Sequence, residues 1–452
     1  MDDESEFAEP TGSLSRQAYN IVERMMIQGE IPPGALLSEV LLSQMIGIGR
    51  TPVREALQRL ARDRLVTIVP RRGAVVSRLG PEEYLDTLPI RREVEREIVT
   101  IMAKVACRQH RHSLLGLAKE MREAVDEGSI YKAIEIDRRF KLIEAAACNN
   151  TLLLSAIRPL HALSRRFYFA QARKPLPQVA LAQARLMEHI AQGDEGAARD
   201  THDAFVNAIE SFAHRLRQRA KTMGGPKVDQ KRAAHIFHSD GSSLSSQAFQ
   251  VIEHRIITRQ YTENELLTEG RLGEELGLGR TPIREALQKL ASHHLVTIIP
   301  RKGVHVTDFE SLDLETLVQA RRPLEALLCR RAAERANAMQ RRGLHSVMEP
   351  WLEAANRNDN ATIMRLDLEM KSLLIEAAGS IYLADAITPI HTLARALYFR
   401  HQTTSDLDVA HAQVEVLQAI IDGNPLEAGL GALRFIAESA HAIRKSLRCI
   451  YK

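Results

Sequence analysis

Apolar residues recur every three or four positions along most of the chain, and this spacing predicts amphipathic helices. Residues 14–29 show it first, and the helix must stop at the run IPPGALL that follows. A second, shorter helix is expected after Ser38, with its end at Gly47. The N-terminal segment is therefore predicted to begin with two short helices.

A third helix is predicted within GRTPVREALQRL at residues 49–60. Thr51 is expected to cap it, and Pro52 to lie in its first turn, where the missing N–H of proline costs nothing. The next segment, LVTIVPRRGAVVSRL, alternates and predicts a two-stranded ribbon that turns at its basic RRG run. Helix, turn and helix followed by a basic hairpin is the pattern of a winged helix-turn-helix.

Helix then follows helix over about 135 residues, an approximate length read from the periodicity. Segments such as EEYLDTLPIRREVEREIVTIMAKVA and ATIMRLDLEMKSLLIEAA place apolar residues three and four apart. This part is predicted to be an antiparallel, all-helical bundle.

The whole arrangement occurs twice. Adding 230 to a residue number maps Thr51 to Thr281 and Asp137 to Asp367 without a gap, and 17 of the 26 residues from Thr51 to Val76 are identical in the second copy. Such internal similarity marks a duplicated structural unit. The predicted fold class is mainly α, with two copies of a winged helix-turn-helix plus a helical bundle in one chain.

Boundaries follow from the same patterns and from a segment rich in Gly, Pro and charge between the copies. The winged domains are expected at residues 12–80 and 242–310, the helical domains at 81–218 and 311–448, and the linker at 219–241.

Composition narrows the class of protein. No apolar run approaches the roughly 20 residues that span a bilayer, the N-terminus is acidic, and the four cysteines form no CxxC pair, so we expect a cytoplasmic protein. A net charge of +4 requires any nucleic-acid surface to arise from local clustering. The chain contains no Gly-rich phosphate loop, GxSxG elbow or HExxH motif, so we expect neither enzyme activity nor a cofactor.

The third helix has the chemistry of a DNA reader. Arg50 precedes the expected cap and Arg54 lies on one face, while Ala56, Leu57 and Leu60 lie on the other and are expected to pack inward. Arginine at a helix N-terminus is unfavourable for the helix itself, because that end already carries partial positive charge. A phosphate or a guanine edge would explain the placement better than simple solvation.

The segments RTPVREAL and RTPIREAL resemble the recognition-helix motif of the GntR superfamily of bacterial transcription regulators. The helical parts resemble the FadR-like branch, whose effector-binding bundle is called the FCD domain. In that family, the first arginine, the threonine, the second arginine and the wing tip contact DNA. The resemblance implies DNA contacts from Arg50, Thr51, Arg54, Arg71, Arg72 and Gly73, and from Arg280, Thr281, Arg284, Arg301, Lys302 and Gly303.

The second helix departs from the family pattern. Many relatives place a DNA-contacting arginine directly after a characteristic glutamate, but here Val40 follows Glu39 and Gly270 follows Glu269.

The metal site of many FCD domains is also altered. The resemblance places the ligands, an Asp and three His, at Asp137, Lys141, Gln183 and Phe205, and at Asp367, Lys371, Gln413 and Phe435 in the second copy. An ammonium group is a poor ligand and a phenyl ring cannot coordinate, so no metal is expected in either bundle.

Lys141 and Lys371 suggest a substitute for the metal ion. Their fixed positive charge could attract a carboxylate or another anionic group of an effector. The alternative is an ordinary helix ion pair with Asp137 or Asp367, four residues earlier, worth about 0.3–0.5 kcal/mol. Both interpretations stay open at this point.

Other polar residues recur within apolar helices and could line an effector pocket or form a structural network. The candidate effector-binding residues are Arg91, Asp137, Lys141, His161, Arg165, Tyr168, Gln183, Arg321, Asp367, Lys371, His391, Arg395, Tyr398 and Gln413. The cluster CRQHRH is not repeated in the second copy and is interpreted as a solvated basic loop.

The resemblance implies a ligand-responsive regulator, most often a repressor, with a small organic acid or an acyl derivative as effector. Two units in one chain predict an intramolecular pseudo-dimer that binds a pseudo-palindromic operator in double-stranded DNA, and further homodimerisation stays open. No membrane partner is expected. The alternative is a constitutive or architectural repressor whose helical domains only mediate dimerisation.

Overall fold

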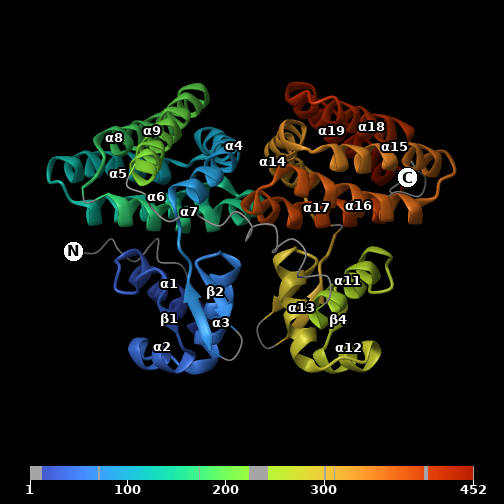
Figure 1. Cartoon of the computed structure of the whole chain (residues 1–452), viewed down its shortest axis with the longest axis horizontal. Helices are drawn as coiled ribbons and strands as arrows, with labels where there is room; N and C mark the ends of the chain where they lie inside the picture. Colours follow the sequence, from blue (N-terminus) through green and yellow to red (C-terminus); the bar gives the residue numbers. More distant parts are fainter. Residues whose placement is uncertain are drawn as a thin grey trace. The chain divides into compact units, whose positions relative to one another are not determined.

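The computed structural model describes residues 13–69, 72–172, 174–222, 243–299, 302–309, 311–401 and 406–450. The chain divides into two compact units, Met1–Gly225 and Pro226–Lys452, called the first and second unit below. Each contains a small winged domain followed by a helical domain (Figure 1). The predicted fold class is confirmed. No described helix has the length and hydropathy needed to cross a membrane.

The winged domain of the first unit contains three helices and three short strands. In chain order they are α1 (Leu14–Ile27), β1 (Leu36–Leu37), α2 (Glu39–Ile46), α3 (Arg50–Arg62), β2 (Val66–Val69) and β3 (Gly73–Val76). The strands form an antiparallel sheet in the order β1-β3-β2, with Val66 opposite Val76 and Leu36 opposite Val75. The predicted two-stranded ribbon is thus extended by β1, because the backbone before α2 returns to the free edge of β3.

Helix α3 starts two residues earlier than a cap at Thr51 would require, at Arg50 instead of Pro52. Gly49 is its N-cap, without a side-chain cap hydrogen bond, so the assignment of Thr51 as the cap is wrong. Pro52 still lies in the first turn, where backbone N–H groups have no partner within the helix. The predicted inward face is confirmed, because the side chains of Leu57 and Leu60 are buried in the core of the domain.

Backbone geometry fixes the identity of Gly73 in the wing of the first unit. Its φ is +108°, and a Cβ atom there would lie 2.1 Å from the backbone oxygen of Leu37. Only glycine adopts this conformation and allows β1 to pass so closely.

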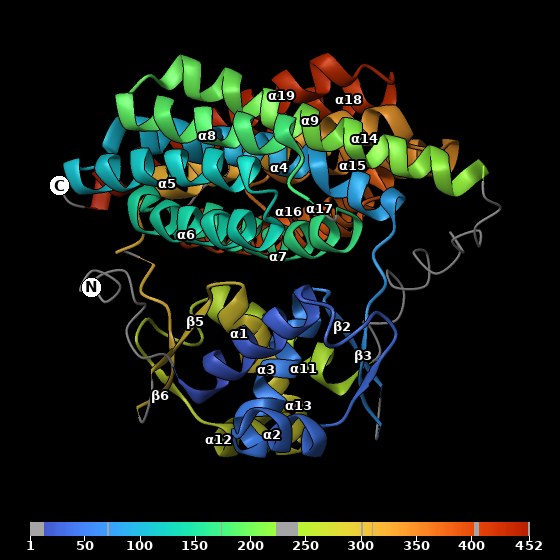
Figure 2. The same ribbon diagram turned by 90° about the vertical axis from the view of Figure 1, so that its left-hand side faces the viewer.

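The helical domain of the first unit follows without a strand. Its helices are α4 (Pro81–Val105), α5 (Arg108–Asp126), α6 (Ile130–Cys148), α7 (Thr151–Gln171), α8 (Pro177–Gln192) and α9 (Glu195–Thr222). Helix α4 packs against α9, and α5 packs against both α8 and α6 (Figure 2). The CRQHRH segment forms the start of α5 and not a loop, since Cys107 is the helix N-cap. Helix α9 continues to Thr222, beyond the expected end of the domain.

The second unit repeats these elements at the 230-residue offset. They are α11 (Leu244–Ile257), β4 (Leu266–Leu267), α12 (Glu269–Leu276), α13 (Arg280–Ser292), β5 (Val296–Ile299), β6 (Gly303–Val306), α14 (Leu314–Arg335), α15 (Ala338–Asn356), α16 (Asn360–Ala378), α17 (Ile381–His401), α18 (Leu407–Ile421) and α19 (Pro425–Ile450). The strand order β4-β6-β5 matches that of the first sheet.

Candidate functional site

The candidate DNA-binding residues of the recognition helices are exposed. Arg54 donates two hydrogen bonds to the carboxylate of Glu39 on α2, each of 2.8 Å. Arg284 makes the same paired contact with Glu269, at 2.7 Å. In both units, the glutamate that precedes the altered position on the second helix therefore orients the second arginine of the motif.

Other predicted DNA contacts lie around the same end of α3 and α13 and on the wings. Arg50 and Arg280 are the first residues of the two helices and are exposed, as are Thr51 and Thr281. Arg72 and Lys302 are exposed at the wing turns, next to Gly73 and Gly303 at the start of β3 and β6. Arg71 and Arg301 lie outside the described residues.

In the first helical domain, the polar candidates converge on one buried carboxylate, that of Glu95 on α4. Its oxygens accept hydrogen bonds from Arg91, at 3.1 Å, and from Lys141 of α6, at 3.4 Å. They also lie 2.5 Å from His161 Nε2 of α7 and 3.0 Å from His202 Nε2 of α9. Neither Glu95 nor His202 is among the effector-binding residues predicted from the sequence.

The second helical domain has the same centre with fewer members. Lys371 Nζ donates to one oxygen of Glu325 at 2.6 Å, while Arg321 Nε and His391 Nε2 lie 3.0 and 2.9 Å from the other. Glu325, Arg321, Lys371 and His391 come from α14, α16 and α17 and are called the Glu325 hub below. Glu325 itself is 1% exposed. Burial opposes ionisation, but Lys371, His391 and Arg321 outweigh it and hold the pKa of Glu325 well below its ordinary value. Burial also lowers the pKa of His391.

The positions that carry metal ligands in many FCD domains form no ligand set here. Gln183 donates to Asp137 at 2.6 Å, and Phe435 lies under the cationic groups of Arg321 and Lys371, whose charges are 5.0 and 5.4 Å from its ring centre. Within the described residues, no three His, Cys, Asp or Glu side chains are placed to hold a metal ion. The chemistry of these side chains does not fit a metal.

Lys141 does not form the simple helix pair that was its alternative interpretation. Its described ion pairs are to Glu144 at 2.7 Å and to Glu95 at 3.4 Å, whereas Asp137 accepts from Gln183. Burial opposes the charge of Lys141, but the two glutamates raise its pKa.

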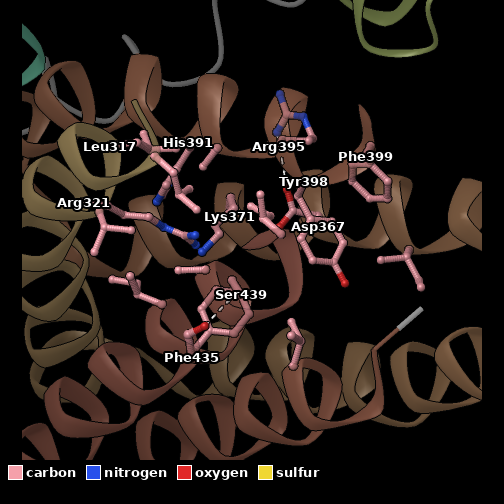
Figure 3. Close-up of a pocket in the computed structure, with 18 of the residues that line it drawn as sticks. Leu317, Arg321, Asp367, Lys371, His391, Arg395, Tyr398, Phe399, Phe435 and Ser439 are labelled. Carbon is pink, nitrogen blue, oxygen red and sulfur yellow. Dashed lines mark hydrogen bonds and ion pairs between the residues drawn. The ribbon is translucent and has the colours of Figure 1, made fainter. Parts of the chain in front are cut away.

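A pocket opens beside the Glu325 hub in the second helical domain (Figure 3). Its cavity volume is about 50 Å³. The predicted residues that line it are Arg321, Asp367, Lys371, His391, Arg395 and Tyr398. Most of the remaining wall is apolar. A wall with several cationic groups on one side and hydrocarbon on the other suits an amphipathic anion.

The pocket wall differs from the prediction at two residues. Gln413 is buried but does not line it, and its Oε1 has no hydrogen-bond partner among the described groups. Trp351, the one tryptophan of the chain, does line it, and its buried Nε1 likewise has no partner among them.

In the first unit, Tyr168 accepts a hydrogen bond from the backbone N–H of Leu176 at 2.7 Å.

One candidate arginine in each unit joins the helical domain to the winged domain. Arg165 of α7 donates to Glu23 of α1 at 2.7 Å, and its equivalent Arg395 of α17 donates to Glu253 of α11. Arg395 also lies 3.4 Å from Asp367 in the pocket wall (Figure 3). This arginine therefore contacts the winged domain and the pocket at the same time.

His293, at the end of α13, lies at the same junction in the second unit. Its Nδ1 is 3.2 Å from the hydroxyl of Thr392 on α17, and its ring packs edge-on against Phe249. Burial, together with the nearby charges of Lys289 and Arg395, lowers the pKa of His293 to about 3.

Acidification should therefore weaken the second unit. The unfolded chain binds a proton at His293 below about pH 6.5, while the folded chain does not until about pH 3, so stability is complete above pH 6.5 and falls below it. Between pH 7.5 and 5.0 this residue should cost about 2 kcal/mol of unfolding free energy. Urea unfolding followed by circular dichroism at both pH values measures it. His293→Gln is the control, and an acid-induced loss of equal size in this variant would contradict the assignment.

Comparison with known proteins agrees with this architecture. The model for bacterial regulatory proteins of the gntR family matches residues 14–76 and 244–306, and the FCD domain model matches residues 86–217 and 316–437. The regulator McbR of Escherichia coli is 28% identical over 33% of this chain and 67% of its own length. The repressor RspR of the same organism is 28% identical over 31% of this chain and 62% of its own length.

A further relative and a solved structure are covered over a larger share of their own length. The repressor GlaR of Escherichia coli is 26% identical over 41% of this chain and 87% of its own length. The solved structure of Escherichia coli McbR/YncC is 23% identical, with a TM-score of 0.41, over 45% of this chain and 99% of its own. Since the two family models recur in the same order and together cover most of the residues, the chain belongs to the GntR family of bacterial transcription regulators and carries two winged helix-turn-helix domains and two FCD domains in tandem.

Proposed function

We propose that this regulator is a repressor that binds a pseudo-palindromic operator with its two winged domains and releases it when a small organic anion binds. The observation that carries the proposal is the pocket beside Glu325, whose wall contains Arg321, Lys371 and Arg395 and is otherwise largely apolar. RspR and GlaR are described as repressors, which favours repression over activation.

The recognition helices support the DNA half of the proposal. Arg54 and Arg284 are exposed and held by a glutamate in the same geometry in both units. Such paired contacts preorganise a guanidinium group, whose planar fork matches a phosphate or a guanine edge. The two helices differ only at Val53 against Ile283, Arg59 against Lys289, and their final residue, so both should read nearly the same half-site.

The junction arginine provides a route from ligand to DNA. Arg395 divides its guanidinium between Glu253 of the winged domain and Asp367 of the pocket wall. A carboxylate that enters the pocket would compete for this arginine and weaken its bond to Glu253. Ligand and operator would then favour different positions of the winged domain, which is the requirement for allosteric coupling.

The test begins with thermal unfolding of the full chain against organic acids, acyl thioesters and divalent cations, since a ligand of the folded state raises stability. An acid family should shift the melting temperature, divalent cations should not, and the same acid should release operator DNA. Lys371→Met should then weaken acid binding at least tenfold, an estimate for a lost charge-assisted contact. Lys445→Met removes an exposed lysine of the same domain and should leave binding unchanged.

A second candidate function is constitutive repression, with helical domains that only mediate dimerisation. It is favoured by the internal neutralisation of Lys371 and Arg321 by Glu325, which gives these cations a partner without a ligand. Operator binding that no acid alters, together with unshifted melting, would establish it in place of ligand-controlled repression.

A further inference from the structure

The two helical domains are not equivalent inside. In the first unit, a contiguous cluster of buried residues packs where the pocket opens in the second. The members Tyr84, Leu88, Val179, Phe205, Val206, Ile209 and Ala213 correspond, at the 230-residue offset, to the pocket-lining residues Leu314, Val318, Val409, Phe435, Ile436, Ser439 and Ile443. The same positions thus belong to a core cluster in one copy and line a cavity in the other.

Three aromatic rings fill this part of the first unit. Tyr84 stacks on Phe167 with ring centres 4.0 Å apart, and Phe167 meets Phe212 edge-on at 6.4 Å. The equivalents of these three rings are Leu314, Leu397 and Ala442. Each replacement is smaller, and Leu314 is the one of the three that lines the pocket, whereas the lining residues Ile443 and Trp351 are larger than their equivalents Ala213 and Met121. Interiors are packed densely enough that lost ring atoms leave space unless the backbone collapses.

Hydrogen bonds hold Tyr84 in place within the core cluster of the first unit. The Tyr84 hydroxyl lies 2.6 Å from Ser164 Oγ, and Arg91 donates to the same oxygen at 2.6 Å. Leu314 and Ala394 occupy the equivalent positions in the second unit and cannot form this network. The tyrosine hydroxyl therefore stands where a ligand would have to approach Arg91.

The two units also differ in the number of buried carboxylates that face the arginine and lysine of the site. In the first unit, Arg91 and Lys141 face two carboxylates, because Glu144 adds a contact of 2.7 Å to that of Glu95. Its equivalent is Leu374, so Glu325 is the one carboxylate among the described residues that pairs with Arg321 and Lys371. The junction arginine and its acidic partners recur in both units, so the first site carries one buried negative charge more than the second.

We infer that the helical domains have divided their roles: the second binds one amphipathic organic anion per chain, and the first is filled by its own side chains and serves as a scaffold. The inference rests on the proposed effector function and assigns it to one half of the molecule. The anion's charged end faces the cationic side of the pocket, formed by Arg321, Lys371 and Arg395, and its hydrocarbon part lies along the apolar wall that includes Trp351.

The probe for this division is 8-anilinonaphthalene-1-sulfonate, an amphipathic aromatic anion, titrated against the full chain. Because Trp351 lines the second pocket and is the one tryptophan, energy transfer from it reports binding there. We expect one site per chain, with loss of Trp351 emission in proportion to occupancy. Two equivalent sites would overturn the division of roles while leaving the proposed effector function intact.

Reciprocal variants locate the site. Leu314→Tyr with Ser439→Ile introduces first-unit residues into the second pocket and should weaken probe binding at least tenfold. Tyr84→Leu with Phe212→Ala introduces second-unit residues into the first and should raise the stoichiometry from one to two. The variant Leu314→Tyr with Ser439→Ile is called the filled variant, and the variant Tyr84→Leu with Phe212→Ala is called the opened variant. If the filled variant does not give a folded circular dichroism spectrum, the opened variant still tests the division of roles, because its second pocket is unchanged.

Three further outcomes count against the inference. It fails if probe binding survives filling of the second pocket, or if the folded, opened variant still takes one probe. It also fails if the wild-type chain binds no probe. In that last case the sensing half of the proposed function fails with it, while operator binding measured on the same preparation tests the DNA half separately.

Discussion

Replacing the arginines of one recognition helix should lower operator affinity by a factor of about 10² to 10⁴, the range in which a linked second site contributes to binding. The variant Arg50→Ala with Arg54→Ala leaves the second unit unchanged, and Arg280→Ala with Arg284→Ala is its mirror. Each variant chain then retains one functional recognition helix. The loss should far exceed that of a single contact, because the second half-site is otherwise reached at high effective concentration.

The fold should tolerate these changes. Arg54 and Glu39 form an ion pair with side chains 64% and 30% exposed, and exposed pairs contribute about 0 to 1 kcal/mol. Reduced DNA affinity can therefore be attributed to lost DNA contacts rather than to unfolding.

The measurement uses an operator selected by the wild-type chain from random DNA, compared with its isolated half-site at one fixed salt concentration. Salt must be matched because phosphate contacts dominate affinity and depend steeply on it. Each variant should bind the full operator about as weakly as the wild type binds the half-site. Arg62→Ala is the matched control, since it removes one charge from the far end of the same helix, where the second unit has Ser292. Equal wild-type affinity for the full operator and the half-site would refute simultaneous binding by both winged domains.

Neutralising Glu325 should destabilise the second unit by about 3–5 kcal/mol, the usual consequence of leaving buried charges without their partner. In Glu325→Gln, Lys371 and Arg321 keep their charge but lose the carboxylate to which both bind. Neither cation is exposed enough to regain full hydration. His391 also loses its acceptor at 2.9 Å.

The equivalent variant of the first unit is the control. In Glu95→Gln, Lys141 retains Glu144 at 2.7 Å and Arg91 retains Ser164 at 2.6 Å, so the loss should be clearly smaller. Urea unfolding monitored by circular dichroism compares the two variants, and Trp351 fluorescence reports the second helical domain alone. A loss below about 1 kcal/mol in Glu325→Gln, the scale of an exposed pair, would mean that its cations find water or other partners.

The sequence by itself determined the duplication, the fold class and the recognition helices. These depend on local signals, because helical periodicity, a proline in a first turn and a glycine-tipped hairpin each act over a few neighbouring residues. Even there, Thr51 was mistaken for a cap. A proline is tolerated anywhere in the first turn, so Pro52 could not distinguish a helix capped by Gly49 from one capped by Thr51.

Only the tertiary structure decided what lies at the centre of each helical domain. Glu325 gathers partners from three helices, and its role could not be read from an ordinary Arg321 pair at a spacing of four. The pocket wall has smaller side chains at Leu314, Ala394 and Ser439, which lie on α14, α17 and α19 and replace Tyr84, Ser164 and Ile209 of the first unit. Packing is decided by neighbours in space, so the sum of small substitutions far apart in the chain becomes a cavity only once the helices are assembled.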